Sequence, residues 1–442
     1  MKTKHLMRIF LLLLILIGVS IKANSQNTAV KPPAAIVAGI PVNYDETKVG
    51  TYTLPDPLTL LNGKKVTDAN TWMKKRRPEI LHLYEEYQFG KTPGKPADMS
   101  FNVFDKGTPA FGGKAIRKQV TIYFTKDTSS YKMDLLIYLP ANATKPSPVL
   151  LNISFSANAS VVSDPGVKKS MIWTKTGTRI PAPAMGLGRV NVEQYIAQGI
   201  GVATVNYSDI EPDFIPGIKY GIRGHYLKPR TTQPAGNEWG AISAWAWGMS
   251  RAMDYFETDK DINAKKIAVT GASRLGKTAL WTGAHDPRFA VVIASVSGEG
   301  GAALSRRDYG ETVKHITDST RFMYQFATNY HSFSNDVSKL PVDGHMLISL
   351  IAPRPLLLQT GSTDGWSDPK GEFLAAVAAD PVYHLFGKKG METTTWPEAG
   401  DPILVNNTLS YFMHVGPHGV LPTDHDIFIK FLLKYLVNDQ VK

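Results

Sequence analysis

The 442-residue chain contains no cysteine, so neither a disulfide framework nor a lipid-modified cysteine is available to it. It also lacks internal repeats, long low-complexity tracts and blocks of basic residues, which argues against repeat architectures and against a nucleic-acid-binding arm. With 43% hydrophobic and 20% charged residues, its composition is that of a globular protein that relies on a buried core. We therefore expect one large domain rather than a fibrous or disordered chain.

The N-terminus has the layout of a secretory signal peptide. A short basic segment precedes the apolar run Ile9–Val19, which is too short to span a bilayer comfortably, and small residues follow near Ala23. We predict that residues 1–25 are a signal peptide and that no stable membrane span remains after its removal. The protein is then exported, to the periplasm of a Gram-negative bacterium or beyond. The alternative is an uncleaved N-terminal anchor.

The formal net charge is +11, and removing the four basic residues of the predicted signal peptide leaves +7. A basic surface favours an anionic substrate such as a uronic-acid polysaccharide. Solubility alone explains the same charge equally well.

Hydrophobic patterning predicts alternating strands and helices. Residues 26–53 are expected to form an extended lead-in, and 54–442 a single domain that begins with a helix over Trp72–Phe89. Extended apolar strands separated by helices predict a mostly parallel central sheet with helices on both faces. The predicted strands are Gln119–Phe124, Met133–Leu139, Val149–Phe155, Gly201–Val205, Lys266–Thr270, Val291–Val296 and Pro355–Thr360, and the later helices are Glu238–Thr258, Lys277–Gly283, Glu372–Ala379 and Ile427–Leu436.

Two stretches rich in Gly and Pro, Ala157–Arg189 and Ser208–Asn237, lack clear periodicity. Segments of this length without regular structure often border functional sites. We predict that they are loop insertions that form walls around the site.

The segment KKIAVTGASRLGKTALW contains a candidate nucleophile, Ser273, between an apolar strand and a helix. A sharp strand-to-helix turn exposes a serine hydroxyl and needs small neighbours, of which Gly271 is one. However, Leu275 stands where the common G-x-S-x-G pattern has its second glycine, and Gly276 comes one residue late. A serine that merely caps the helix is the alternative.

The order of the downstream residues favours catalysis. Asp364 and Asp368 follow an apolar strand, and His414 and His418 lie in a loop before the last helix. Serine is a poor nucleophile until a histidine takes its proton, and a carboxylate holds that histidine in the required tautomer. Nucleophile, acid and base in this chain order are typical of a serine hydrolase with a parallel sheet.

Several segments resemble bacterial glucuronoyl esterases of carbohydrate esterase family fifteen, and the resemblance covers nearly the whole chain from about Leu54. The G-x-S-R-x-G-K turn is its most specific mark and accounts for the displaced glycine. The segments are EWGAISAWAWGMSRAMDYFETD, VTGASRLGKTALWTGAHDPRFA, SGEGGAALSRRDYGET and HMLISLIAPRPLLLQTGSTDGWSDPKGEF.

The resemblance implies an α/β-hydrolase fold with a serine triad and no metal or other cofactor. It implies that Ser273 is the nucleophile, that His418 is the base, and that Arg274 stabilises the oxyanion, a role for which a guanidinium is well suited. It further implies that the substrate uronate is bound by Lys277, Glu311 and Trp366, the last by ring stacking.

The chain departs from the family pattern in two places. Many members carry the triad acid as a glutamate where this chain has Val296, which cannot orient an imidazole. Asp364 matches the position used by other bacterial members and is our predicted acid, with Asp368 and Glu299 as alternatives. The second departure is Arg321, where an aromatic residue is expected, so the shape of the pocket or its preference for the leaving group is expected to differ.

The leading hypothesis is a monomeric serine esterase that cleaves esters of (4-O-methyl-)glucuronic acid on xylan, and thereby lignin–carbohydrate ester links. One alternative is an acetylxylan or other acyl esterase on the same scaffold. Another is a catalytically silent carbohydrate-binding homologue, which Val296 makes conceivable. A metal site near Asp424, His425 and Asp426 is not expected, because no distant third ligand is evident.

Overall fold

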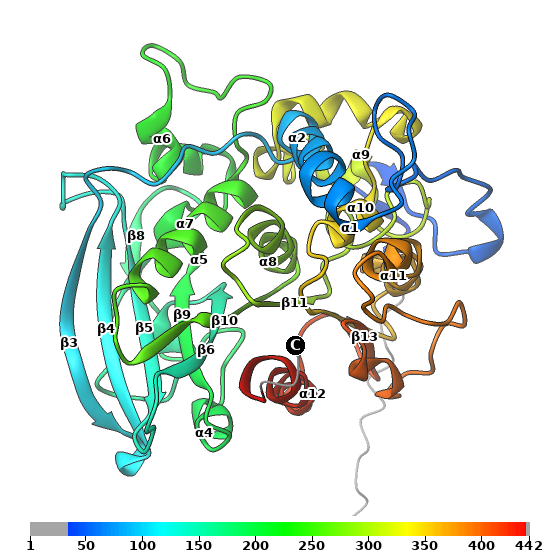
Figure 1. Cartoon of the computed structure of the whole chain (residues 1–442). Coiled ribbons are helices and arrows are strands. Elements are labelled where there is room, and N and C mark those ends of the chain that lie inside the picture. Colours follow the sequence, from blue (N-terminus) through cyan, green and yellow to red (C-terminus); the bar gives the residue numbers. More distant parts are fainter. Residues whose placement is uncertain (1–33, 439–442) are drawn as a thin grey trace, which may run out of the picture. The chain divides into compact units, whose positions relative to one another are not determined.

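A nine-stranded sheet forms the centre of the computed structural model, which describes residues 34–438. The strand order is β13-β12-β11-β10-β6-β9-β5-β4-β3. From β13 to β9 neighbouring strands are parallel, whereas β5, β4 and β3 join antiparallel at the other edge (Figure 1). The predicted mostly parallel sheet is confirmed, and the predicted signal peptide lies outside the described residues.

The strands and helices have the following bounds. The strands of the central sheet are β3 (Ser100–Ala110), β4 (Ala115–Tyr123), β5 (Lys132–Pro140), β6 (Ser147–Ser154), β9 (Gly201–Asn206), β10 (Ile262–Ala272), β11 (Val291–Ser295), β12 (Leu356–Gly361) and β13 (Leu409–His414). Two small hairpins are β1 (Ile36–Val37) with β2 (Ile40–Pro41), and β7 (Met171–Trp173) with β8 (Arg179–Pro181). The helices are α1 (Ala69–Thr71), α2 (Arg77–Tyr87), α3 (Asn158–Val161), α4 (Val192–Ile196), α5 (Tyr207–Ile210), α6 (Ile222–Tyr226), α7 (Ala241–Phe256), α8 (Arg274–His285), α9 (Val313–Ile316), α10 (Gly344–Ser349), α11 (Pro369–His384) and α12 (Asp424–Leu432).

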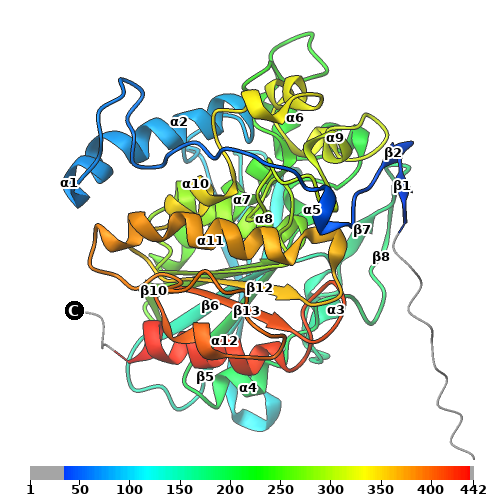
Figure 2. The ribbon, with the colours of Figure 1, turned by 90° about the vertical axis from the view of Figure 1, so that its right-hand side faces the viewer.

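Helices cover both faces of the sheet, as predicted. Helices α10 and α11 lie on one side of it with α7 and α8, and α4 and α12 lie on the other (Figure 2). The helices on each side pack against the sheet through a separate apolar core. Because the strands are buried on both faces, they carry continuous apolar runs.

All seven predicted strands are present, but two strands of the central sheet and the four short hairpin strands were not predicted. Strand β3 is a largely exposed edge strand interrupted by Gly107 and Pro109, so it lacks the apolar alternation that marks a strand. Strand β13 is buried along its whole length but is only six residues long. The predicted helix over Trp72–Phe89 was only partly right, because the five residues Trp72–Arg76 form a π-helical segment before α2 begins.

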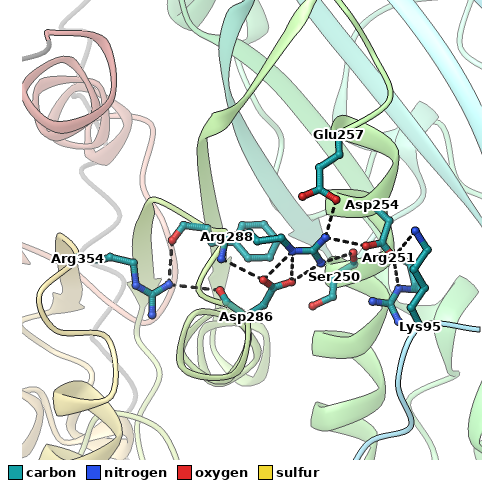
Figure 3. Close-up of polar contacts among 9 residues, drawn as sticks. Lys95, Ser250, Arg251, Asp254, Glu257, Asp286, Arg288 and Arg354 are labelled. Atoms are coloured by element: carbon teal, nitrogen blue, oxygen red, sulfur yellow. Dashed lines mark hydrogen bonds and ion pairs between the residues drawn. The ribbon is translucent and has the colours of Figure 1, made fainter. Parts of the chain in front are cut away.

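The end of α8 is held by guanidinium groups. Arg354 donates to the backbone carbonyl of Gly283, and Arg77 donates to that of Ala284, so carbonyls that have no partner within the helix are satisfied. Arg288 joins Asp286, just after α8, to Asp254 of α7 at 2.7 and 2.8 Å (Figure 3). These contacts fix the helix at whose other end Ser273 lies.

The two insertions contain only short elements, namely α3, β7 and β8 in the first and α5 and α6 in the second. Within residues 34–438, no helix is long and apolar enough to cross a membrane.

Candidate active site

Ser273 lies in a strained turn between β10 and α8. Its backbone has φ 59° and ψ −129°, a region that non-glycine residues rarely adopt, and its N–H donates to the carbonyl of Ser295 at 2.9 Å. A Cβ on Gly271 would lie 2.3 Å from the carbonyl oxygen of Leu275, and a Cβ on Gly276 would lie 2.5 Å from that of Ser295. Both glycines are therefore required by close backbone approach, which explains why the second glycine stands one residue late.

Helix α8 begins at Arg274, three residues earlier than predicted. The first N–H groups of a helix have no partner within it and carry partial positive charge. Because α8 begins directly after Ser273, these groups lie beside the serine, where an anion formed on a substrate carbonyl would be stabilised.

Asp364 and His418 are joined by a short hydrogen bond. Asp364 follows β12 and is buried, whereas His418 follows β13 and is 41% exposed. His418 Nδ1 donates to Asp364 Oδ2 at 2.6 Å, and Ser367 Oγ lies 3.1 Å from the same nitrogen. This bond sets the tautomer in which Nε2 is free to accept a proton.

Ser273 and His418 line the same cavity of about 810 Å³. No hydrogen bond joins their side chains in the part of the chain that the structure describes. The hydrogen bond between a nucleophile and its base is often long or poorly aligned before a substrate binds. The cavity also extends along the first insertion, which contributes Ser163 and Leu187 to its wall.

The alternative acid Asp368 is engaged elsewhere. It accepts from Arg307 Nε at 2.9 Å and from the backbone N–H of Gly371, and so caps α11. Burial raises the pKa of this carboxyl to about 6, with the Arg307 guanidinium opposing the shift.

The alternative acid Glu299 is also engaged elsewhere. It accepts from Ser305 Oγ at 2.6 Å and from the Tyr330 hydroxyl at 3.2 Å. Burial raises the pKa of Glu299 to about 8, so this carboxyl is neutral at pH 7. No hydrogen bond to His418 is present for Glu299 or Asp368 among the described residues.

A buried carboxyl that the sequence analysis missed, Glu372, lies close to the proposed acid. Its Oε1 accepts from the backbone N–H of Gly298 at 2.6 Å and from Ser297 Oγ at 3.2 Å. Burial raises the pKa of Glu372 to about 8, the charge of Asp364 adds to the shift, and the Lys277 ammonium opposes it. A neutral Glu372 adds no negative charge beside Asp364.

The Arg274 side chain is anchored by Asp213, a residue of the second insertion that no motif marks. Asp213 pairs with Arg274 Nη1 and also accepts from the Tyr324 hydroxyl at 2.6 Å and from Gln325 Nε2 at 2.8 Å. The Arg274 guanidinium lies 4.6 Å from the centre of the Phe322 ring. Burial works to lower the pKa of Arg274, but the Asp213 charge and the neighbouring Tyr207 and Tyr324 together outweigh it and the pKa is raised, so the guanidinium stays charged.

The residues expected to bind a uronate lie near each other. Lys277 is buried one turn into α8, and burial lowers the pKa of its ammonium while the charge of Glu311 opposes the shift. The backbone N–H of Glu311 donates to the Trp366 carbonyl at 2.8 Å. Arg321 Nη2 donates to Glu311 Oε1 at 3.0 Å, and the Arg321 guanidinium lies 5.0 Å from the centre of the Trp366 indole.

A second histidine–aspartate pair supports the loop that carries His418. His414 Nδ1 lies 2.8 Å from Asp424 Oδ2, and His414 Nε2 lies 2.8 Å from the carbonyl oxygen of Pro417. Both side chains are buried. His414 thus contacts the residue just before His418.

Comparison with known proteins identifies the family of the chain. A family model described as "Glucuronyl esterase, fungi" matches residues 167–387. The protein named Carbohydrate esterase MZ0003, from an unknown prokaryotic organism, is 46% identical over 399 residues, which cover 88% of this chain and 91% of that protein. The chain belongs to the glucuronoyl esterase family.

Two further relatives of the glucuronoyl esterase family extend the comparison. A solved glucuronoyl esterase from Solibacter usitatus has a TM-score of 0.83 at 47% sequence identity, over 88% of this chain and 99% of that one. The 4-O-methyl-glucuronoyl methylesterase 1 of Wolfiporia cocos is 30% identical over 346 residues, 76% of this chain and 72% of its own length. Membership of this family confirms the α/β-hydrolase fold and makes the chain a carboxylic ester hydrolase.

The glucuronoyl esterase site has no cluster of metal ligands among residues 34–438, where no group of three or more His, Asp or Glu side chains could hold an ion. His425, near which a metal was considered, bonds instead to the Tyr195 hydroxyl at 2.6 Å.

Proposed function

We propose that the protein hydrolyses esters of (4-O-methyl-)glucuronic acid on xylan, with Ser273 as nucleophile, His418 as base and Asp364 as acid. The single observation that supports this most directly is the 2.6 Å bond between His418 and Asp364 at the rim of a cavity that Ser273 also lines. The names of the relatives supply the class of substrate.

The reaction follows from the positions of these groups. Ser273 Oγ attacks the C6 carbonyl of the uronate ester as His418 Nε2 takes its proton, and the Asp364 carboxylate stabilises the imidazolium. The oxyanion is stabilised by the first N–H groups of α8 and by the charged Arg274 side chain. His418 then protonates the departing alcohol, and a water molecule, deprotonated by His418, releases the uronate from Ser273.

Three polar or aromatic side chains are proposed to hold the sugar. Lys277 is buried without a hydrogen bond or ion pair to its ammonium within the described residues, so its donors are free for a sugar hydroxyl. Glu311 and Trp366 both contact the Arg321 guanidinium. A buried ammonium without a partner is costly, and a polar ligand that accepts from it offsets that cost.

The alternative of an acetylxylan or other acyl esterase is separated from this proposal by substrate comparison. We expect benzyl glucuronate to be hydrolysed with a kcat/KM at least about tenfold above that of p-nitrophenyl acetate, because only the uronate uses Lys277, Glu311 and Trp366. A preference for the acetate would instead support the acyl esterase.

The nucleophile is tested by Ser273→Ala and by labelling with a fluorophosphonate. We expect the variant to fold, to lose turnover of methyl glucuronate and to resist labelling, while the wild type is labelled. Turnover retained by Ser273→Ala would refute the nucleophile, and a wild type that is neither active nor labelled would support a silent carbohydrate-binding homologue.

We further propose that the protein is exported through its N-terminal signal and acts as a monomer on glucuronoxylan in the periplasm or outside the cell. The charge and hydropathy pattern of residues 1–25 supports the signal. Sequencing the N-terminus of protein recovered outside the cytoplasm should show cleavage near Ala23, and a full-length N-terminus would contradict the proposal. Size-exclusion chromatography with light scattering tests the monomer.

A further inference from the structure

Arg321 occupies a place in the site that neither the triad nor the oxyanion requires. Its guanidinium lies 5.0 Å from the centre of the Trp366 ring and 4.8 Å from that of Phe322. Phe322 in turn lies 4.6 Å from the Arg274 guanidinium. The four side chains therefore form a continuous stack from the uronate side of the site to Arg274, with Arg321 in the middle.

The ion pair of Arg321 with Glu311 uses only one of the two carboxylate oxygens. Arg321 Nη2 donates to Oε1 at 3.0 Å, and both side chains are largely buried, at 14% and 8% exposure. Glu311 Oε2 has no hydrogen bond within the described residues. A charge-assisted bond restrains the oxygen that accepts it, so the carboxylate is held through Oε1 while Oε2 can accept from a ligand.

The stack also restricts how Trp366 can be used. With a guanidinium over one face of the indole and the His315 ring edge-on at 5.3 Å, the indole is held from two sides. The Trp366 side chain is only partly buried, and its Nε1 has no hydrogen bond to any described residue. The donor edge of the ring therefore remains for a ligand, in addition to any face that Arg321 leaves open.

We propose that Arg321 is a positioning residue of the uronate subsite, which orients Glu311 and Trp366 so that the sugar is held by Glu311 Oε2, the Lys277 ammonium and the indole edge. This inference rests on the proposed function and assigns a role to the position where an aromatic residue was expected. An aromatic ring there could pack on Trp366 but could not pair with Glu311.

The inference predicts a change in binding rather than in chemistry. We expect Arg321→Met to raise KM for methyl glucuronate by about tenfold while kcat changes less than about threefold, because the carboxylate that accepts from the sugar loses its fixed orientation. Arg321→Lys, which retains the charge but not the planar fork, should restore part of the affinity. Lys175→Met, which removes an exposed cation from the cleft that Arg321 also lines, is the matched control and should have the wild-type KM.

A double-mutant cycle separates positioning from a merely structural role. If Arg321 acts mainly through Glu311, adding Arg321→Met to Glu311→Gln should change KM less than about twofold. Independent, multiplying effects would overturn the inference, as would an Arg321→Met enzyme with wild-type KM or with a loss confined to kcat. Circular dichroism shows whether each variant folds, and if Arg321→Met does not, Arg321→Lys carries the test with an expected KM between two- and tenfold above wild type.

The failure of this inference is distinguishable from that of the proposed function. A wild-type enzyme that does not hydrolyse methyl glucuronate refutes the function and this inference together. An active wild type whose Arg321 variants have an unchanged KM refutes the inference alone.

Discussion

At the scale of single residues, the chain departs from the family pattern in the carboxylate that bonds to His418. Asp364 bonds to His418, whereas Asp368 and Glu299 bond to other partners. Val296 is buried, and its backbone N–H donates to the carbonyl of Gln359. The position at which a glutamate was expected is therefore occupied by a buried valine without a carboxylate.

We expect Asp364→Asn to lower kcat by about 10³–10⁴-fold with little change in KM, because the amide favours the wrong imidazole tautomer. Steady-state kinetics on methyl glucuronate measure this. Glu299→Gln is the matched comparison and should lower kcat far less, since Glu299 does not contact His418. The reverse ranking would identify Glu299 as the acid.

The anchor of Arg274 gives a second prediction at this scale. Asp213→Asn keeps the shape of the side chain but removes the charge that holds the guanidinium, so we expect kcat to fall by about tenfold. Tyr324→Phe removes one donor to Asp213 and leaves the ion pair, so its effect should be smaller. Equal kcat values for Asp213→Asn and the wild type would show that the anchor does not contribute to catalysis.

At the scale of elements, α8 is the helix that begins beside Ser273, and its far end is held by two partly buried arginines. Arg354 donates to the carbonyls of Gly283, Asp286 and Phe289. Burial lowers the pKa of Arg354 to about 10, and the neighbouring Arg77 adds to the shift. The guanidinium is therefore still charged at neutral pH.

Removing this cap should cost stability rather than chemistry. We expect Arg354→Met to lower the free energy of unfolding by about 2–4 kcal/mol, because buried carbonyls lose their donors. Denaturant titration of the purified protein measures the loss. Arg354→Lys, with a single ammonium, should recover only part of it, and a variant as stable as the wild type would contradict the role assigned to this cap.

The loop between β13 and α12 is the second element that the site depends on. His414, at the end of β13, bonds to Asp424, at the start of α12, and to the carbonyl oxygen of Pro417. These two buried contacts hold together the two ends of the loop that carries His418.

At the scale of the whole molecule, two buried carboxyls make stability depend on pH. Burial raises the pKa of both Glu299 and Glu372 from the ordinary value of 4.5 to about 8. Between these values the native state binds more protons than the unfolded chain, so the free energy of unfolding falls as the pH rises from about 4.5 to about 8. Ordinary paired carboxylates produce the opposite trend.

We therefore expect Glu372→Gln, which stays neutral at every pH, to reduce the fall in Tm between pH 5 and pH 8. The groups that face Glu372 are Asp364, Lys277, Ser297 and the backbone of Gly298. Thermal unfolding followed by circular dichroism across this range is the measurement. Parallel Tm curves for variant and wild type would show that Glu372 is ionised in the native protein.

Local patterns in the sequence were sufficient to predict much of the fold and the turn that carries Ser273. Continuous apolar strands and the G-x-S-R-x-G-K turn are short-range patterns, whereas the order of Ser273, Asp364 and His418 along the chain is not. The edge strand β3 was not predicted because it is largely exposed and contains Gly107 and Pro109, and β13 was not predicted because Ser410 and His414, although buried, interrupt its apolar run.

What the amino-acid sequence determined by itself is the architecture and the class of chemistry, because strand, turn and helix preferences act between near neighbours. Only the tertiary structure decided which carboxylate meets His418, that Asp213 holds Arg274, and that Arg321 lies between Glu311 and Trp366. These contacts join residues 10 to 61 positions apart. Asp213 lies in the second insertion, and the other contacts involve loops that follow β11, β12 and β13, so they depend on how the loops pack over the sheet and leave no local pattern in the chain.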